Sequence, residues 1–282
     1  MATDLLRRLV AYLLARLPGT TIARVRSLPL IGPLIHAASH RLTPPGTTLW
    51  VAVESGSAAG LRFLLDPRYE GDFWQGTHES EVINRLPELL SVGAVVYDVG
   101  AHLGYFALTA ARLVGASGRV YAFEADPGNA ERLATHVEAN NLDTVRIVPL
   151  AVWSKPGTVS FATDESHPIR SYGRVGATGV TRDVEATSLE TFAVEAPRPD
   201  LIKIDVEGGE LEVLVGARRL LAETPPIVIC EVHLEAGAAA DRLRLTTELL
   251  EGHGYRIEVL TPGSDPTHLL AVHKACVSFG SL

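Results

Sequence analysis

The segment Val95–Glu124, VVYDVGAHLGYFALTAARLVGASGRVYAFE, decides the fold of this 282-residue chain. It opens with an apolar, β-branched run that contains Asp98 and is followed at once by Gly100. A stretch with helical spacing then extends to about Val114, and a second apolar run ends at Glu124. A strand, a glycine-rich turn, a helix and a second strand in this order predict one unit of a doubly wound α/β sheet.

The chain continues the same alternation beyond this segment. Further strands are predicted at VRIVPL, LIKIDV, PIVICEV, YRIEVL and HLLAVH, and helices at 127–140, at 209–221 and through Leu249. Only ThrProGlySerAspProThr separates the last two runs, which is too short for a crossover helix, so the final strand should run antiparallel to its neighbour. We therefore predict an α/β fold with a seven-stranded doubly wound sheet and an antiparallel last strand.

An amphipathic helical extension is predicted over residues 1–45. Leucines recur there at helical spacing with arginines between them, and two prolines and Gly46 end the segment. Its apolar run is too short to span a bilayer, and it lacks the cleavage pattern of a secretory signal. It could lie on a membrane surface, pack on the catalytic domain or form a homodimer contact. Packing is the favoured interpretation, because most such helices face a core.

Residues 46–92 are predicted to lead into the main domain, which we place at 93–282. Two short apolar runs, Thr48–Val53 and Leu61–Leu65, indicate a small hairpin. Thr77 is expected to cap a helix that runs to about Leu90, with Glu79 and a second glutamate in its first turn.

The composition excludes several classes of protein. A hydrophobic fraction of 46% and a charged fraction of 21% are typical of a soluble globular protein. The net charge of -8 opposes binding to nucleic acid, and no transmembrane segment is expected. Two widely separated cysteines do not support a disulfide framework or a zinc cluster, so we expect reduced cysteines and a cytoplasmic location.

The glycine-rich turn predicts a nucleoside pocket. In an open α/β sheet, ligands bind beyond the carboxyl ends of the strands. Gly100 and Gly104 allow a sharp turn and close approach of a ligand, Asp98 can accept from an ammonium group, and Glu124 can accept from ribose hydroxyls. The spacing lacks the third glycine of the pyrophosphate-binding G-x-G-x-x-G fingerprint, which favours a nucleoside without phosphates.

Five blocks in a fixed order show a resemblance to a known family. They are GlyThrHisGlu at 76–79, TyrAspValGlyAlaHisLeuGlyTyrPhe at 97–106, ArgValTyrAlaPheGluAlaAspPro at 119–127, LeuIleLysIleAspValGluGlyGlyGlu at 201–210 and CysGluValHis at 230–233. With these blocks the chain resembles the FkbM-type methyltransferases. It departs from the family at His102, where asparagine is usual.

The resemblance implies a Rossmann-like class I methyltransferase that uses S-adenosylmethionine. It also implies a small-molecule acceptor and, most often, O-methylation of a hydroxyl on a sugar or other natural product. The candidate cofactor contacts are then Glu79, Asp98, Gly100, His102, Gly104, Tyr105, Glu124 and Ala125.

A hydroxyl acceptor must lose its proton, so a general base or a metal is needed. The catalytic candidates lie at the ends of two strands and are Lys203, Asp205, Glu231 and His233. His233 could act as the base with Glu231 orienting it, or Asp205, Glu231 and His233 could bind Mg²⁺ or Mn²⁺. Structural roles are the alternatives: Lys203 as the partner of a carboxylate, and His233 as a hydrogen-bonded strand-end histidine.

Further residues are candidates for the acceptor pocket. Glu207 sits in the turn after LIKIDV, although it could simply stabilise the next helix, and Trp74 could wall the pocket or belong to a core. The segment Thr163–Gly179 reads as a long polar loop, either a substrate cover or a plain insertion. Its possible contacts are His167, Arg170 and Tyr172.

Two other functions compete with methyl transfer. An NAD-dependent oxidoreductase is favoured by the strand, the turn and Glu124 but not by the missing glycine. A catalytically inactive nucleoside-binding scaffold protein is the other, and the intact Asp98, Glu124, Asp205 and His233 argue against it.

Overall fold

The computed structural model describes residues 47–66, 68–163, 173–175, 181–233 and 239–276. The predicted extension at 1–45, with its membrane and homodimer roles, lies outside these ranges, as do His167, Arg170 and Tyr172. The chain divides into two compact units between Asn84 and Arg85, inside the segment 46–92 that the sequence analysis kept together. No helix in the described ranges has the length and apolar character needed to cross a membrane.

The first unit contains the predicted hairpin. Strands β1 (Leu49–Ala52) and β2 (Arg62–Leu65) pair antiparallel, and the short helices α4 (Gly71–Gln75) and α5 (Ser80–Ile83) follow. Phe63, Phe73 and Val82 are buried in this unit.

The single helix predicted from Thr77 to Leu90 is wrong. The structure has α5 there and then a separate helix α6 (Leu86–Leu89), which belongs to the second unit. The N-cap of α5 is Glu79, whose φ of 43° lies in the left-handed region, and not Thr77. Pro87 lies in the first turn of α6, where its missing N–H is tolerated, whereas inside one continuous helix it would remove a hydrogen bond.

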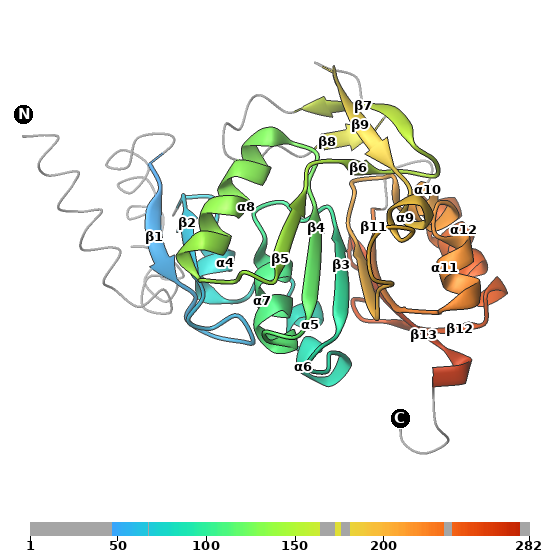
Figure 1. The fold of residues 1–282 in the computed structure, drawn as a ribbon, viewed down its shortest axis with the longest axis horizontal. Helices are drawn as coiled ribbons and strands as arrows, with labels where there is room; N and C mark the ends of the chain where they lie inside the picture. Colours follow the sequence, from blue (N-terminus) through green and yellow to red (C-terminus); the bar gives the residue numbers. More distant parts are fainter. Residues whose placement is uncertain (1–46, 67, 164–172, 176–180, 234–238, 277–282) are drawn as a thin grey trace, which may run out of the picture. The chain divides into compact units, whose positions relative to one another are not determined.

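The second unit is built on the predicted seven-stranded sheet. Its strands are β3 (Val95–Val99), β4 (Arg119–Phe123), β5 (Val145–Val148), β10 (Leu201–Ile204), β11 (Ile227–Val232), β12 (Tyr255–Val259) and β13 (Thr267–His273). They lie in the order β12-β13-β11-β10-β3-β4-β5 (Figure 1). The first five named are parallel, and β13 is antiparallel to both of its neighbours. The predicted fold class is confirmed.

Helices pack on this sheet because its strands are apolar on both faces. The helices are α7 (Tyr105–Val114), α8 (Pro127–Ala139), α9 (Leu189–Phe192), α10 (Glu210–Val215), α11 (Arg218–Glu223) and α12 (Ala239–Gly252), and a short 3-10 helix, η1 (Lys274–Cys276), follows β13. Helix α7 contacts β3, β4 and β5, and α8 contacts β5. Tyr97 of β3 and Phe123 of β4 lie on the same face of the sheet, in a hydrophobic core that also contains Leu220. The ring of Phe192 packs edge-on against both of these aromatic rings.

The helix predicted over 209–221 is also two helices, α10 and α11. The chain breaks at Gly216, where a Cβ atom would lie 2.3 Å from the carbonyl oxygen of Trp153. The low helix propensity of glycine and the close approach of another segment both favour the end of α10 at this point.

A second, smaller sheet was not predicted. Strands β6 (Ala151–Val152), β7 (Gly157–Thr163), β8 (Gly173–Val175) and β9 (Thr181–Thr187) form it in the order β6-β9-β7-β8. The loop expected over Thr163–Gly179 therefore contains a strand, since β8 pairs with β7. Most of β9 is exposed or only partly buried, so its sequence carries no apolar alternation from which a strand could be read.

Candidate functional site

The glycine-rich turn after β3 is held by tight protein contacts. Gly100 and Gly104 have φ values of 84° and 91°, which favour glycine. A Cβ atom on Gly100 would lie 1.7 Å from the carbonyl oxygen of Asp205, and one on Gly104 would lie 2.1 Å from Leu133 Cδ1. The sequence predicts a sharp turn at Gly100 and the close approach of a ligand at Gly104, and in the structure neighbouring protein atoms already fill the space that a Cβ atom would need at both glycines.

Glu124 follows β4 and is fixed by two backbone groups. Its Oε2 accepts from the N–H of His102 at 2.7 Å, and its Oε1 accepts from the N–H of Asp126 at 2.8 Å. Burial raises the pKa of Glu124 to about 7, against these two hydrogen bonds, which lower it. Each carboxylate oxygen has two lone pairs, so the group can still accept from hydroxyls of a ligand.

The buried end of β3 carries Asp98, which is fully buried. The register places Asp98 beside Lys203 of β10 on the same face of the sheet. Lys203 Nζ donates to Asp205 Oδ2 at 2.9 Å and lies 5.7 Å from the ring centroid of Phe106. These contacts fit the structural alternative for Lys203, a buried cation that neutralises carboxylates.

His233, directly after β11, is surrounded by carboxylates. Its Nδ1 lies 2.8 Å from Glu210 Oε1, and its Nε2 lies 3.3 Å from Glu207 Oε2 and 3.6 Å from Glu231 Oε1. Burial lowers the pKa of His233, but the hydrogen bond with Glu210 and the charges of Glu207 and Asp205 raise it to about 9. This pKa favours, at neutral pH, the protonated form of the ring, in which both nitrogens carry a proton.

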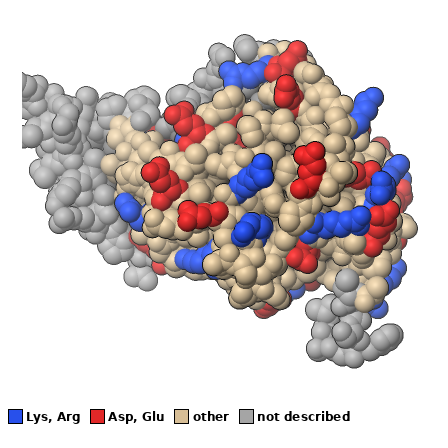
Figure 2. Space-filling model, in the orientation of Figure 1, with Lys and Arg blue, Asp and Glu red and all other residues tan. Residues whose placement is uncertain are grey.

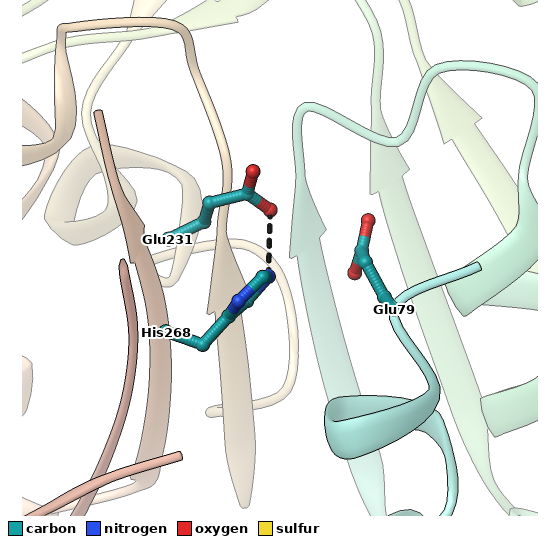
Figure 3. Close-up of side chains that lie close together, drawn as sticks. All are labelled: Glu79, Glu231 and His268. Carbon is teal, nitrogen blue, oxygen red and sulfur yellow. Dashed lines mark hydrogen bonds and ion pairs between the residues drawn. The ribbon is translucent and has the colours of Figure 1, made fainter. Parts of the chain in front are cut away.

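Glu231 has a second histidine partner, which comes from the antiparallel strand. His268 lies opposite Glu231 in the pairing of β13 with β11, and its Nε2 is 3.0 Å from Glu231 Oε2 (Figure 3). Thr261 Oγ1 accepts from the backbone N–H of His268 at 2.8 Å and lies 3.2 Å from its Nδ1. A threonine hydroxyl that donates to Nδ1 leaves the proton of a neutral ring on Nε2, facing Glu231.

The structure gathers the predicted acceptor-site residues. Asp205, Glu231 and His233 each offer one ligand atom within 4.8 Å of the others. The sequence analysis missed Glu210 and His268, and it paired Glu231 with the histidine where the structure places Glu210 on Nδ1. Glu210 is the last residue of the block that begins with LIKIDV, but its spacing suggested only a helix start. His268 could be found only from the register of the last strand.

The other candidates have contacts of their own. In the first unit, Trp74 is buried, and Glu79 Oε1 lies 3.1 Å from His78 Nε2. In the second unit, Tyr105 begins α7 and is buried, and Ala125 follows Glu124. The cofactor roles of Glu79, Tyr105 and Ala125 and the acceptor role of Trp74 stay predictions.

Comparison with known proteins places the chain among methyltransferases. Residues 98–257 match the family model described as the methyltransferase FkbM domain. The hexuronic acid methyltransferase AglP of Haloferax volcanii is 31% identical over 55% of this chain and 62% of that protein. The AMB antimetabolite synthetase AmbE of Pseudomonas aeruginosa is 28% identical over 79% of this chain. The chain thus spans 62% and 12% of the lengths of these two relatives.

Among solved structures, the methyltransferase FkbM from Methylobacillus flagellatus KT is similar to this chain. The two are 19% identical with a TM-score of 0.48, over 65% of this chain and 44% of the other.

Proposed function

The chain belongs to the methyltransferase FkbM domain family, and from this membership we propose that it is an S-adenosylmethionine-dependent O-methyltransferase that acts on a hydroxyl of a sugar or another small natural product. One observation carries the proposal. The parallel strands β4 and β11 end at the same edge of one sheet, β4 in the carboxylate Glu124, which suits ribose hydroxyls, and β11 in the cluster of carboxylates around His233. This edge is where ligands bind in open α/β sheets.

The residues at the ends of β3 and β4 suit the cofactor. Glu124 offers lone pairs to ribose hydroxyls while two backbone N–H groups fix its orientation. Asp98 suits the ammonium group of the amino-acid tail. When bound, S-adenosylmethionine supplies a methyl group on a positively charged sulfur. The absence of a third glycine agrees with a ligand that carries no pyrophosphate.

The cluster around His233 suits the acceptor. Methylation of a hydroxyl forms an O–C bond, breaks the S–C bond with its electron pair left on sulfur, and releases the hydroxyl proton. In the proposed mechanism, Nε2 of neutral His233 takes this proton. Glu210 on Nδ1 orients the ring, and Glu207 and Glu231 stabilise the imidazolium that forms. A histidine with a raised pKa is a stronger base for a weakly acidic alcohol, although a smaller fraction of it is unprotonated at neutral pH.

A divalent cation is the second way in which these side chains could activate the acceptor. Asp205, Glu231 and His233 offer two oxygens and one nitrogen close together, a donor set that suits Mg²⁺ or Mn²⁺. Chelation separates the two mechanisms. If EDTA leaves turnover intact and His233→Ala abolishes it, the base mechanism holds. Loss with EDTA that Mg²⁺ restores supports the cation.

The acceptor class that we propose is a glycoside, with a hexuronic acid as the first compound to test. One relative is named for a hexuronic acid, which offers several ring hydroxyls. A base such as His233 is needed for a hydroxyl but not for a carboxylate, which is already ionised. The cluster around His233 therefore points to a hydroxyl of such a sugar.

The test is transfer of an isotopically labelled methyl group from S-adenosylmethionine to methyl glucosides, methyl glucuronides and polyketide alcohols, with the product located by NMR. We expect a methyl ether, and a loss of about 10²-fold or more with His233→Ala. The control is His253→Ala, because the His253 ring lies just after α12 with its Nδ1 2.8 Å from the backbone carbonyl of Leu249, and it is not part of the cluster around His233. Methylation of the carboxylate, or equal activity in both variants, would contradict the proposed mechanism.

A further inference from the structure

A buried histidine outside the predicted set contacts the glycine-rich turn. His136 lies on α8 and is fully buried. Its Nδ1 is 2.8 Å from the carbonyl oxygen of Leu103, which lies between Gly100 and Gly104. A carbonyl oxygen only accepts, so Nδ1 must carry the proton and donate it. The sequence analysis gave His136 no role, because it falls inside an ordinary helical pattern.

The residue before Leu103 is the strained one. His102 has a φ of 51°, in the left-handed region, which costs a residue other than glycine about 1–2 kcal/mol. This same residue donates its N–H to Glu124 Oε2. The direction of that N–H depends on the turn keeping a conformation that its own sequence does not favour. A hydrogen bond at the next residue, Leu103, opposes relaxation of the turn.

Helix α8 also contacts both Glu124 and the glycine-rich turn. The N–H of its N-cap, Asp126, donates to Glu124 Oε1. Leu133 of α8 packs beneath Gly104, and His136, one turn further along, binds Leu103. Glu124, the turn and α8 therefore form a closed ring of contacts, in which His136 provides a polar link between the turn and the helix.

We propose that His136 is a positioning residue of the cofactor pocket: by donating Nδ1–H to Leu103 it holds the His102 peptide so that its N–H points at Glu124. His136 does not touch the cofactor in this account. It acts through His102 on the carboxylate that accepts from the ribose. The inference rests on the proposed function, since it gives Glu124 the role of ribose acceptor.

Three substitutions test the donor. His136→Asn places an amide N–H close to the position of Nδ1, His136→Gln moves it one bond further out, and His136→Leu removes it at similar volume. The probe is S-adenosylhomocysteine, measured by titration calorimetry. We expect His136→Leu and His136→Gln to weaken the affinity for S-adenosylhomocysteine about fivefold to tenfold, which is the effect of one hydrogen bond. The affinity of His136→Asn should stay within about threefold of that of the wild type.

The matched control is His253→Leu. His253 also places Nδ1 2.8 Å from a backbone carbonyl, that of Leu249, but at the end of α12. Its loss should leave the affinity for S-adenosylhomocysteine unchanged. In NMR spectra, the amide proton of His102 should shift upfield in the Leu and Gln variants and keep its position in the Asn variant. General destabilisation would not single out this proton.

The outcomes separate the inference from the proposed function. If the wild type is folded and does not bind S-adenosylhomocysteine, the proposed function fails and this inference fails with it. If the wild type binds and folded His136→Leu binds equally well, only the inference is overturned. Should the Leu variant not fold, the Asn and Gln pair decides, because equal affinity in those two amide variants also overturns it.

Discussion

At the scale of single residues, two ionisable groups with displaced pKa values lie in the two halves of the candidate site, one in the proposed cofactor pocket and one in the proposed acceptor pocket. Glu124 is an acid whose pKa is raised by burial, and His233 is a base whose pKa is raised by neighbouring carboxylates. Groups matched to a task in this way cluster at functional sites, although structural ion pairs also produce them. Each group leads to a prediction that depends on the sign of its shift.

Glu124 should make cofactor binding depend on pH. Its pKa of about 7 means that the free carboxyl group is partly protonated at neutral pH. The ionised form accepts from hydroxyls better, so the affinity for S-adenosylhomocysteine should rise from about pH 6 to about pH 8 and then level off. Glu124→Gln should weaken binding by about tenfold or more and remove this dependence. The matched control, Glu131→Gln on the exposed side of α8, should change neither.

His233 should set the pH dependence of turnover. The neutral ring is the active form, so kcat/KM should rise with pH through about 9 and level off above it. Glu210→Gln removes the negative charge beside Nδ1 of His233 and therefore lowers the pKa of the ring. The plateau of kcat/KM should then be reached at lower pH. Glu212→Gln, in the same helix, should leave the profile in place. A profile that Glu210→Gln does not move would contradict the assignment of His233 as the base.

The gathering of Asp205, Glu207, Glu231 and His233 could be predicted from their places at strand ends. The partners of these residues could not. Glu210 reaches His233 because the backbone changes direction at Glu207 and Gly208, which both have positive φ. The spacing of residues in the sequence does not reveal this change of direction. His136 reaches Leu103 only through the packing of α8 on the turn.

At the scale of elements, the sequence predicted the strands of the seven-stranded sheet, but it predicted neither the smaller sheet nor the places where two helices break. The long apolar runs of the central sheet identify its strands whatever surrounds them. The breaks at Gly216 and before α6, and the smaller sheet of β6 to β9, depend on contacts with other segments or on exposed strands without apolar alternation.

Gly100 lies in the turn between β3 and α7, and its substitution should lower the stability of the fold. A Cβ atom there would collide with the carbonyl oxygen of Asp205, and φ is positive. We expect Gly100→Ala to lower the free energy of unfolding by about 3 kcal/mol or more in denaturant titrations. Gly252→Ala, at the end of α12 with nothing near the new Cβ, should change it by about 1 kcal/mol or less.

The antiparallel last strand should contribute to catalysis through His268. It places this ring opposite Glu231, where Nε2–H holds the carboxylate that faces His233 (Figure 3). His268→Leu should lower kcat by about tenfold, with little change in the KM for S-adenosylmethionine, and His268→Gln, which keeps an N–H near Nε2, should restore most of it. The control is His273→Leu at the other end of β13. Equal kcat in the Leu and Gln variants would argue against this role.

At the scale of the whole molecule, the distribution of charge and the fold bear on the small-molecule acceptor that we propose. The net charge is -8, and acidic and basic side chains are interspersed on the face that Figure 2 shows. On that face, the described side chains do not form the basic stripe that a polyphosphate backbone needs. The sheet order and the missing third glycine favour a nucleoside with a sulfonium over a dinucleotide.

The most direct test of this account is titration calorimetry of the wild-type chain with S-adenosylhomocysteine and, separately, with NAD. We expect saturable binding of one S-adenosylhomocysteine per chain, weakened by Glu124→Gln, and no comparable binding of NAD. Tight binding of NAD without binding of S-adenosylhomocysteine would contradict it.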